Sequence, residues 1–163
     1  MKGKKHTAHP ETTIGHVHLT VADLERSLGF YRDILGFEVM ARYGDSAVFL
    51  SAGGYHHHIA LNTWAGVGAT PPPQGHSGLY HVAILFPTRK DLAVAVDRLI
   101  KAGYPLEGTA DHGVSEAIYL RDPDNIGVEL YCDRPRKEWK MNGSEVMMVS
   151  ERLDIQDLLN QIP

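Results

Sequence analysis

Two histidines and one glutamate in this sequence stand at positions from which they can share a divalent metal ion. His16 and His81 each open an alternating, strand-like stretch, and the two stretches begin 65 residues apart. Glu129 lies inside an apolar strand-like run, where a buried carboxylate needs a partner. Two imidazoles and one carboxylate suit a borderline divalent ion and leave coordination positions for water and substrate. The residues therefore predict an open metal site at His16, His81 and Glu129.

Each of these residues has a simpler alternative interpretation. A single histidine in a strand is more often a structural residue with ordinary hydrogen bonds, and Glu129 can be an edge-strand carboxylate that faces solvent while Val128 and Leu130 are buried. Two histidines at equivalent positions of a repeat, with a glutamate in an apolar strand, make the metal interpretation harder to dismiss, but the residues alone leave both interpretations open.

A repeated pattern of elements must position the three residues. In the first copy, a strand at 16–21 precedes a helix that Asp23 caps and Gly36 ends, followed by strands at 38–42, 47–50 and 58–62. In the second copy, a strand at 81–86 precedes a helix that Thr88 caps and Gly103 ends, followed by strands at 106–109, 117–120 and 128–132. Because neither copy can bury its apolar face alone, we expect the two to share a core.

The expected fold class is α+β, with two βαβββ modules that form a curved, half-open mixed sheet around the metal site. The modules span 12–65 and 79–136 as a single domain 12–136, and the connector 66–78 is rich in Pro and Gly. The tail 137–163 holds one short amphipathic helix that docks either on the body or on a partner subunit.

Composition and charge exclude several classes of protein. The 163 residues are 43% apolar and 22% charged, and no apolar run approaches the roughly 20 residues of a membrane-spanning helix. The net charge of −4 argues against a nucleic acid partner. The stretch 1–10 lacks the apolar segment of a secretory signal, and the single Cys132 suits a reducing compartment. We expect a cytoplasmic protein without a membrane partner.

The first copy also carries family-like motifs: His16-Val17-His18-Leu19, Asp23-Leu24, Phe30-Tyr31 and Ile34-Leu35-Gly36-Phe37. With the repeated module, they resemble the vicinal oxygen chelate superfamily, which includes glyoxalase I, extradiol dioxygenases, and the fosfomycin- and bleomycin-resistance proteins. The likeness covers about residues 12–136. It implies that the opening histidine of each module and the glutamate of the last strand bind the metal, here His16, His81 and Glu129.

The second copy has a more specific likeness. His112, Ile118-Tyr119, Asp122-Pro123 and Glu129 are spaced as in the signature of extradiol dioxygenases, and the runs 112–117 and 133–135 are similar to modules of bacterial catechol 2,3-dioxygenase. The resemblance assigns proton transfer to His112 and a hydrogen bond to substrate to Tyr119. The alternatives are a solvent-facing loop histidine and a core tyrosine.

The sequence departs from that signature in three ways. Asn125 stands where the signature has Gly or Pro, and Ala110 stands where it has a different residue. Since Asn tolerates the left-handed conformation better than other non-glycine residues, we expect the turn at Asn125 to survive. Typical extradiol enzymes of this type carry two such domains, whereas this sequence holds one.

The family's activities differ in their ligand sets, and Ala60 bears on the choice. It occupies the position in the first copy that is equivalent to Glu129, and alanine cannot bind metal. A four-ligand site of the kind that resembles glyoxalase I is therefore incomplete here, which argues against the glyoxalase I reaction. Two histidines and one carboxylate favour a dioxygenase with Fe(II), with Mn(II) or Zn(II) as alternatives. Its substrates would be O2 and a catechol-like aromatic.

Two other functions stay open. One is a different metal-dependent reaction, either a glyoxalase-like isomerase or lyase or a thiol transferase. The other is a resistance-type protein that binds a small molecule without chemistry. Metal content and oxygen consumption with a catechol distinguish these two functions from the dioxygenase.

Three further polar side chains are expected near the metal. Strand parity puts His18 on the face of His16, and puts His58 and Asn62 on the metal-facing side with His57 pointing away. We expect these three to contact the substrate or to orient a ligand. A homodimer is one subunit arrangement, and the site is built either within one chain or across two.

Overall fold

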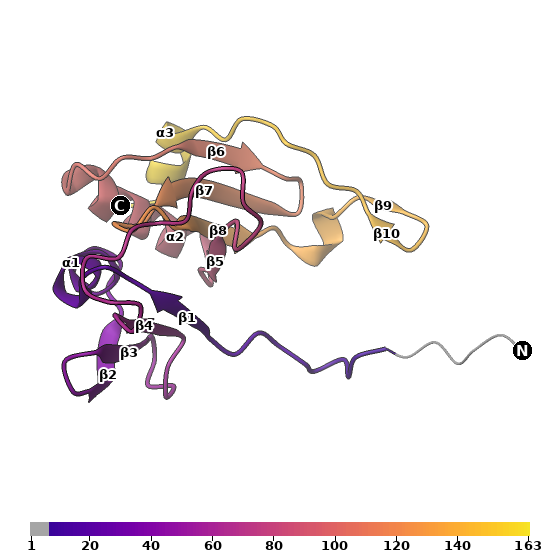
Figure 1. Ribbon diagram of the computed structural model, residues 1–163. Helices are drawn as coiled ribbons and strands as arrows, with labels where there is room; N and C mark the ends of the chain where they lie inside the picture. The colour runs from indigo at the N-terminus through magenta and orange to yellow at the C-terminus, as the bar shows by residue number, and fades with distance from the viewer. Residues whose placement is uncertain (1–6) are drawn as a thin grey trace, which may run out of the picture.

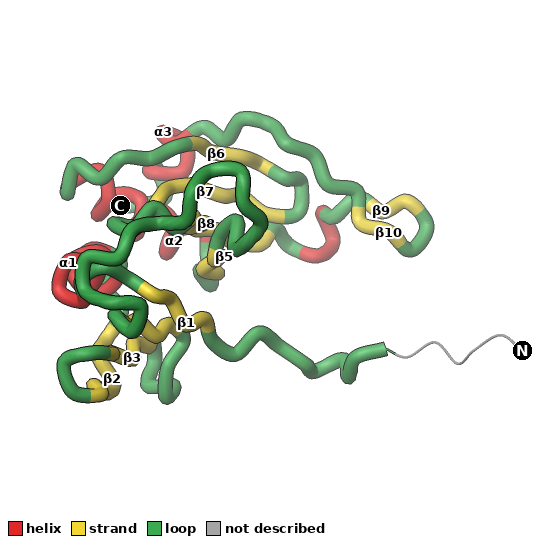
Figure 2. The backbone as a smooth tube through the Cα atoms, in the orientation of Figure 1, coloured by secondary structure: helices red, strands yellow, loops and turns green. Residues whose placement is uncertain are grey.

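The computed structural model describes residues 7–163. The stretch 1–10, which was tested above for a secretory signal, therefore lies mostly outside the described residues. Two small four-stranded sheets with their helices form the body, and an extended arm at 7–15 leads away from it (Figure 1). Loops make up much of the chain between these elements (Figure 2). Within 7–163, no helix is long and apolar enough to cross a membrane.

The first sheet has the order β1-β4-β3-β2. Its strands are β1 (Val17–Thr20), β2 (Glu38–Tyr43), β3 (Ala47–Ser51) and β4 (Ile59–Asn62). β1 pairs parallel to β4, and the other pairs are antiparallel. Between β1 and β2 the chain forms α1 (Leu24–Leu28), which continues as η1 (Gly29–Ile34).

The second sheet has the equivalent order β5-β8-β7-β6. Its elements are β5 (Val82–Leu85), α2 (Arg89–Lys101), β6 (Gly108–Asp111), β7 (Ser115–Arg121) and β8 (Gly127–Asp133). β5 pairs parallel to β8, as β1 does to β4. The predicted α+β class with two βαβββ modules is therefore confirmed, but the strands form two separate sheets rather than one.

Local sequence explains where the helices begin and end. Asp23 accepts a hydrogen bond from the Arg26 amide, and Thr88 accepts one from the Asp91 amide, as N-caps do. Gly36 and Gly103 follow the two helices with φ of +86° and +65°, the left-handed conformation that glycine adopts at little cost.

The first helix differs from the expected continuous α-helix because its second half is a π-helix. The Leu35 amide donates to the Phe30 carbonyl, five residues back, at 3.0 Å. The expected stripe of Leu24, Leu28, Tyr31 and Leu35 is buried all the same. A pattern of apolar spacing identifies the buried face but not the number of residues per turn.

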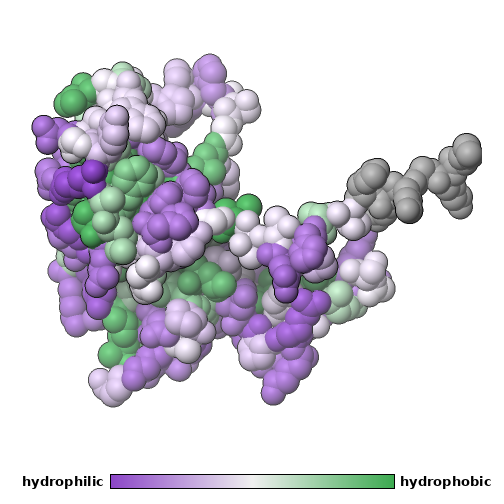
Figure 3. Space-filling view, turned by 90° about the horizontal axis from the view of Figure 1, so that it is seen from below, coloured by the Kyte–Doolittle hydropathy of each residue, from purple (hydrophilic) through white to green (hydrophobic). Residues whose placement is uncertain are grey.

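One apolar core joins both modules. It includes residues of α1, η1, α2 and both sheets, with Leu28, Leu92 and Leu130 fully buried. On the face seen from below, hydrophilic side chains lie among smaller apolar patches (Figure 3). The shared core is what a repeat that cannot bury its apolar face alone requires.

The turn between β7 and β8 ties the modules together through buried carboxylates. Asp124 accepts hydrogen bonds from the Ala22 amide at 2.9 Å and from Ser27 Oγ at 3.2 Å, and its Oδ1 lies 2.5 Å from Arg26 Nη2. Asp122 Oδ2 accepts from the buried Tyr31 hydroxyl at 2.9 Å. Burial raises the pKa of the Asp122 carboxyl, so this group depends on its donors.

We expect Tyr31→Phe to lower the free energy of unfolding by about 1–3 kcal/mol, because it leaves a buried acceptor of Asp122 without its donor. Urea denaturation followed by circular dichroism measures the change. Tyr43→Phe is the matched control, since Tyr43 is 70% exposed in β2. Equal stabilities of the two variants would show that the Tyr31–Asp122 bond contributes nothing to module packing.

The tail folds back onto the second sheet, which answers the question that the sequence left open. After η2 (Arg136–Glu138) and a hairpin of β9 (Met141–Asn142) and β10 (Glu145–Val146), it runs beside β6 and ends in α3 (Ile155–Leu159), which packs on α2 (Figure 1). Leu153 and Leu158 are buried. The expected tail helix therefore docks on the body of its own chain.

Candidate metal centre and proton relay

Glu129 lies on β8, a central strand of the second sheet, and contacts His81. Glu129 is buried, with 9% of the residue exposed, and its Oε2 lies 2.9 Å from His81 Nε2. His81 immediately precedes β5, the strand that pairs with β8. The alternative of a solvent-facing edge carboxylate is therefore wrong, because β8 has a paired strand on each side.

Gly127 explains how His81 comes so close to β8. A Cβ atom at residue 127 would lie 2.1 Å from the Tyr80 carbonyl oxygen and 3.1 Å from His81 Cβ. No side chain fits there without moving the backbone at Tyr80. Glycine at this position therefore lets the start of β5 lie against β8 and places the His81 ring beside Glu129.

Tyr119 and His112 extend the contact away from His81. The Tyr119 hydroxyl, on β7 opposite Glu129, lies 3.4 Å from Glu129 Oε1 and 2.7 Å from His112 Nε2. His112 stands at the turn between β6 and β7. The four side chains form one line of contacts, from His81 through Glu129 and Tyr119 to His112. His112 is a partly exposed turn residue and Tyr119 a partly buried strand residue, so the roles that the resemblance gives them stay predictions.

Burial and the nearby carboxylate keep Tyr119 protonated. Desolvation, followed by the negative charge of Glu129, raises the pKa of Tyr119 to about 12. At neutral pH the hydroxyl is therefore a hydrogen-bond donor. It lies between a carboxylate oxygen and an imidazole nitrogen, each of which can accept its proton.

A cavity of about 750 Å³ lies where the two sheets meet, and His16, His58 and His81 line it together. In the described part of the chain, β1 pairs only with β4 and β5 only with β8, so the cavity runs between two unpaired strand edges. Its other walls are mostly aliphatic, including Val17 and Ile84. Its volume is within the range of small-molecule sites.

His16 faces this cavity but does not join the His81–Glu129 pair. Its ring packs on that of His57, with centroids 4.3 Å apart. Across residues 7–163, no three histidine, cysteine or acidic side chains lie close enough together to hold one ion. The structure thus brings two of the three predicted ligands into contact and places the third on the same cavity wall.

The parity prediction for His57 is wrong. Its ring contacts both His16 and Phe49, so it lies on the side from which it was expected to point away. The physical reason is that β4 begins only at Ile59, so residues before it do not follow the alternation of a strand.

The three supporting polar residues lie at different places. His58 lines the cavity, and its Nδ1 lies 3.2 Å from Ser51 Oγ. Asn62 is buried, and its Oδ1 accepts from the Trp64 amide. His18 packs edge-on against Trp64, with ring centroids 5.0 Å apart. Of the three, only His58 stands beside His16 and His81.

The residues present fit a divalent ion in the spacing of two donors. Ligands at right angles on an ion with bonds of about 2.1 Å lie about 3 Å apart, close to the His81–Glu129 separation of 2.9 Å. His81 Nδ1 is buried and has no hydrogen-bond partner in the described residues. An ion between Nε2 and Glu129 would not reach this nitrogen, so Nδ1 says nothing about the metal.

Asn125 behaves as its sequence position predicted. It has φ of +64°, the only positive value among the non-glycine residues of 7–163, and its amide donates to the Asp122 carbonyl at 3.0 Å. The turn before Glu129 therefore survives the departure from the signature. Ala110, the other departure, is buried in β6 opposite Ala117.

Comparison with known proteins agrees with this architecture. Residues 13–130 match the Glyoxalase/Bleomycin resistance protein/Dioxygenase superfamily model. A catechol-2,3-dioxygenase of Bacillus subtilis is 41% identical over 154 residues, which are 94% of this chain and 53% of that protein. An iron-dependent extradiol dioxygenase of Rhodococcus jostii is 26% identical over 140 residues, 76% of this chain and 44% of that protein.

A solved structure supports the fold alone. A glyoxalase/dioxygenase from Nostoc punctiforme has a TM-score of 0.65 at 18% identity, covering 81% of this chain and 99% of that one. The chain belongs to the glyoxalase/bleomycin resistance/dioxygenase superfamily, as its repeat and motifs predicted. It spans about half the length of the two dioxygenases that it matches.

Proposed function

We propose that this chain carries the active site of an extradiol-type dioxygenase, which opens a catechol-like ring with O2. The observation that carries the proposal is the line of contacts from His81 through Glu129 and Tyr119 to His112, which begins at His81 on the wall of a cavity large enough for an aromatic ring. The 41% identity to a catechol-2,3-dioxygenase supports the same reaction class.

The metal would be held by His81, Glu129 and His16, and we favour Fe(II). The iron-dependent relative and the donor set of two imidazoles and a carboxylate both support this ion, with Mn(II) or Zn(II) as alternatives. When bound, the ion would supply Lewis-acid stabilisation of the substrate's adjacent oxygens and a site for O2. His16 would have to leave His57 to take part.

The chain's own contribution is proton handling and substrate placement. A catechol must lose a hydroxyl proton to become reactive, and the Tyr119–His112 pair provides an acceptor for that proton beside Glu129. The aliphatic walls of the cavity would exclude water and hold the ring. His58, on the same wall, would donate or accept a hydrogen bond to the substrate.

Oxygen uptake tests the proposal. Protein purified without oxygen and loaded with Fe(II) should consume one O2 per catechol and form the yellow ring-opened product, since both oxygen atoms enter the product. His81→Ala should abolish uptake, whereas His76→Ala, in the exposed connector, should not. Iron-loaded protein that binds catechol without consuming oxygen would contradict the proposal.

A second candidate is favoured by one observation. Because the His16 ring packs on His57, the described residues hold no complete ligand set, and the cavity can bind a small molecule without metal chemistry. If the protein only binds a small molecule, its affinity for catechol should stay the same when a chelator removes Fe(II). Isothermal titration with and without chelator separates the two candidates.

A further inference from the structure

The tail residue Val149 holds His112 from the side opposite Tyr119. The Val149 carbonyl oxygen lies 2.8 Å from His112 Nδ1, and the Val149 amide donates to the His112 carbonyl at 3.1 Å. Two hydrogen bonds thus join one residue of the tail to the backbone and the ring of one histidine. The residues are 37 apart in sequence.

The chemistry of this contact fixes the tautomer of the ring. A carbonyl oxygen only accepts hydrogen bonds, so His112 Nδ1 must carry the hydrogen. In the neutral ring Nε2 is then unprotonated, and it accepts from the Tyr119 hydroxyl at 2.7 Å. Proton exchange at His112 is therefore confined to Nε2, the nitrogen that faces Tyr119.

The surrounding structure fits Val149 closely against this turn. Gly113 has φ of +74°, and a Cβ atom there would lie 3.3 Å from Val149 Cγ2. The Gly113 amide donates to Asp111 Oδ1, and the Arg134 guanidinium pairs with the same carboxylate. The turn that carries His112 is thus held rigid on one side and covered by the tail on the other.

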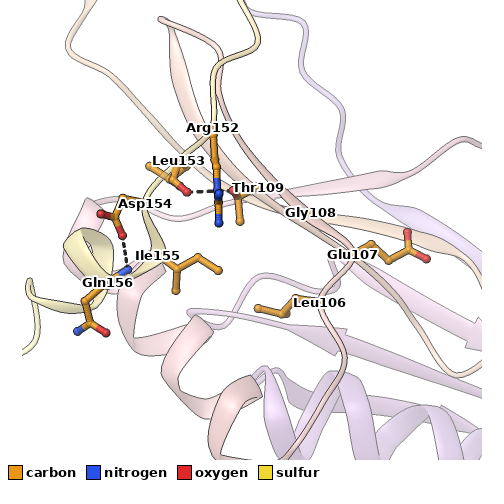
Figure 4. Close-up of a pocket in the computed structure, with 9 residues that line it drawn as sticks. All are labelled: Leu106, Glu107, Gly108, Thr109, Arg152, Leu153, Asp154, Ile155 and Gln156. Atoms are coloured by element: carbon orange, nitrogen blue, oxygen red, sulfur yellow. Dashed lines mark hydrogen bonds between the residues drawn. The ribbon is translucent and has the colours of Figure 1, made fainter.

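The tail beyond Val149 is fastened to β6 and α2. Asp111 and Glu151 exchange two backbone hydrogen bonds, at 2.8 and 2.9 Å. Thr109 Oγ1 donates to the Leu153 carbonyl at 3.0 Å, and the two residues lie side by side on the wall of a groove along β6 (Figure 4). At the end of the tail, Arg89 pairs with Asp157 of α3 at 2.7 Å.

We propose that the tail segment 147–153 is a positioning element, in which the Val149 carbonyl sets His112 in the Nδ1–H tautomer and leaves Nε2 as the proton acceptor. The inference rests on the proposed function, because that function makes His112 the acid-base group. Val149 is a positioning residue that acts through His112. The site then depends on a segment beyond the βαβββ repeat, which family motifs do not cover.

Nitrogen-15 NMR of the metal-free full chain tests this directly. At about pH 8, above the ordinary pKa of a free histidine side chain, the His112 ring should show a protonated Nδ1 and an unprotonated Nε2, with its signals identified by their loss in His112→Gln. Val149→Pro removes the amide donor and displaces the carbonyl, and we expect His112 to give a mixture of tautomers. Val149→Ala keeps both backbone groups and should give the wild-type signals.

Kinetics with Fe(II) and catechol provide the second readout. Val149→Pro should lower kcat about tenfold to hundredfold with little change in KM, because binding does not involve His112 Nε2. If Val149→Pro does not fold, Glu151→Pro carries the test, since it removes the hydrogen bond that the Glu151 amide donates to the Asp111 carbonyl and should loosen the tail beside His112, with the same mixture of tautomers expected.

Failure of this inference differs from failure of the proposed function. A wild-type ring with its hydrogen on Nε2, or Val149→Pro with an unchanged tautomer, overturns the positioning role even in an active dioxygenase. If His112 carries its hydrogen on Nδ1 in the wild type and loses this preference in Val149→Pro, the positioning role is supported even if the protein consumes no oxygen.

Discussion

Glu129→Gln is expected to lose Fe(II) affinity by at least about a hundredfold and, with it, ring cleavage. The loss of a metal ligand should exceed the tenfold to hundredfold effect typical of residues that only support ligands. The amide of glutamine is neutral and binds a divalent ion more weakly than a carboxylate does, and the substitution also ends the carboxylate contacts to His81 and Tyr119. Iron content after anaerobic loading and oxygen uptake with catechol measure the two effects.

The matched control for Glu129→Gln is Glu25→Gln, which changes an exposed carboxylate paired with Arg42. It should bind iron and consume oxygen as the wild type does. A Glu129→Gln protein that holds one iron per chain and turns over catechol would remove Glu129 from the metal site.

His112→Phe is expected to lower kcat by about 10²–10⁴, the usual contribution of a general acid-base group, while iron content stays unchanged. Structure explains why the two effects separate: His112 contacts Tyr119 and Val149, whereas the proposed metal ligands His81 and Glu129 contact each other. Steady-state kinetics and metal analysis of the same preparation give both values.

A double variant shows whether His112 and Tyr119 act as one unit. The kcat of His112→Phe with Tyr119→Phe should be close to that of His112→Phe alone, because groups that pass a single proton lose their effect together. Losses that multiply would mean two independent roles. A His112→Phe protein with the wild-type kcat would exclude proton transfer by this residue.

The architecture was predictable from the sequence because its two signals are local. The alternation of apolar and polar residues indicated the strands. Asp23 and Thr88 indicated where the helices begin, and Gly36 and Gly103 indicated where they end. The repeat then implied a shared core. What failed was the geometry that local patterns do not contain: the π-turn of η1, the division into two sheets and the β9–β10 hairpin.

The candidate site was predictable in its residue types and less so in its arrangement. Parity within β8 and the likeness of the repeat were enough to expect contact between His81 and Glu129. The signature spacing named Tyr119 and His112 as site residues but did not predict the hydrogen bond between them. These residues lie in or beside paired strands, where register fixes side-chain direction.

Two features of the site had no signal in the sequence. The His16 ring packs on His57 because residues before β4 form an irregular loop, whose side-chain directions do not follow a period. The contact of Val149 with His112 is a backbone hydrogen bond between distant segments, and any residue type with an amide and a carbonyl could make it. Only the three-dimensional structure shows such contacts.

The position of the metal ion tests the central claim most directly. Crystals grown without oxygen and loaded with Fe(II) should give one strong anomalous difference peak at the iron edge, within bonding distance of His81, Glu129 and a His16 ring that has left His57. A peak held instead by His56 and His57, whose Nδ1 atoms lie 2.7 Å apart, would contradict the account, as would no ordered iron at the His81–Glu129 pair.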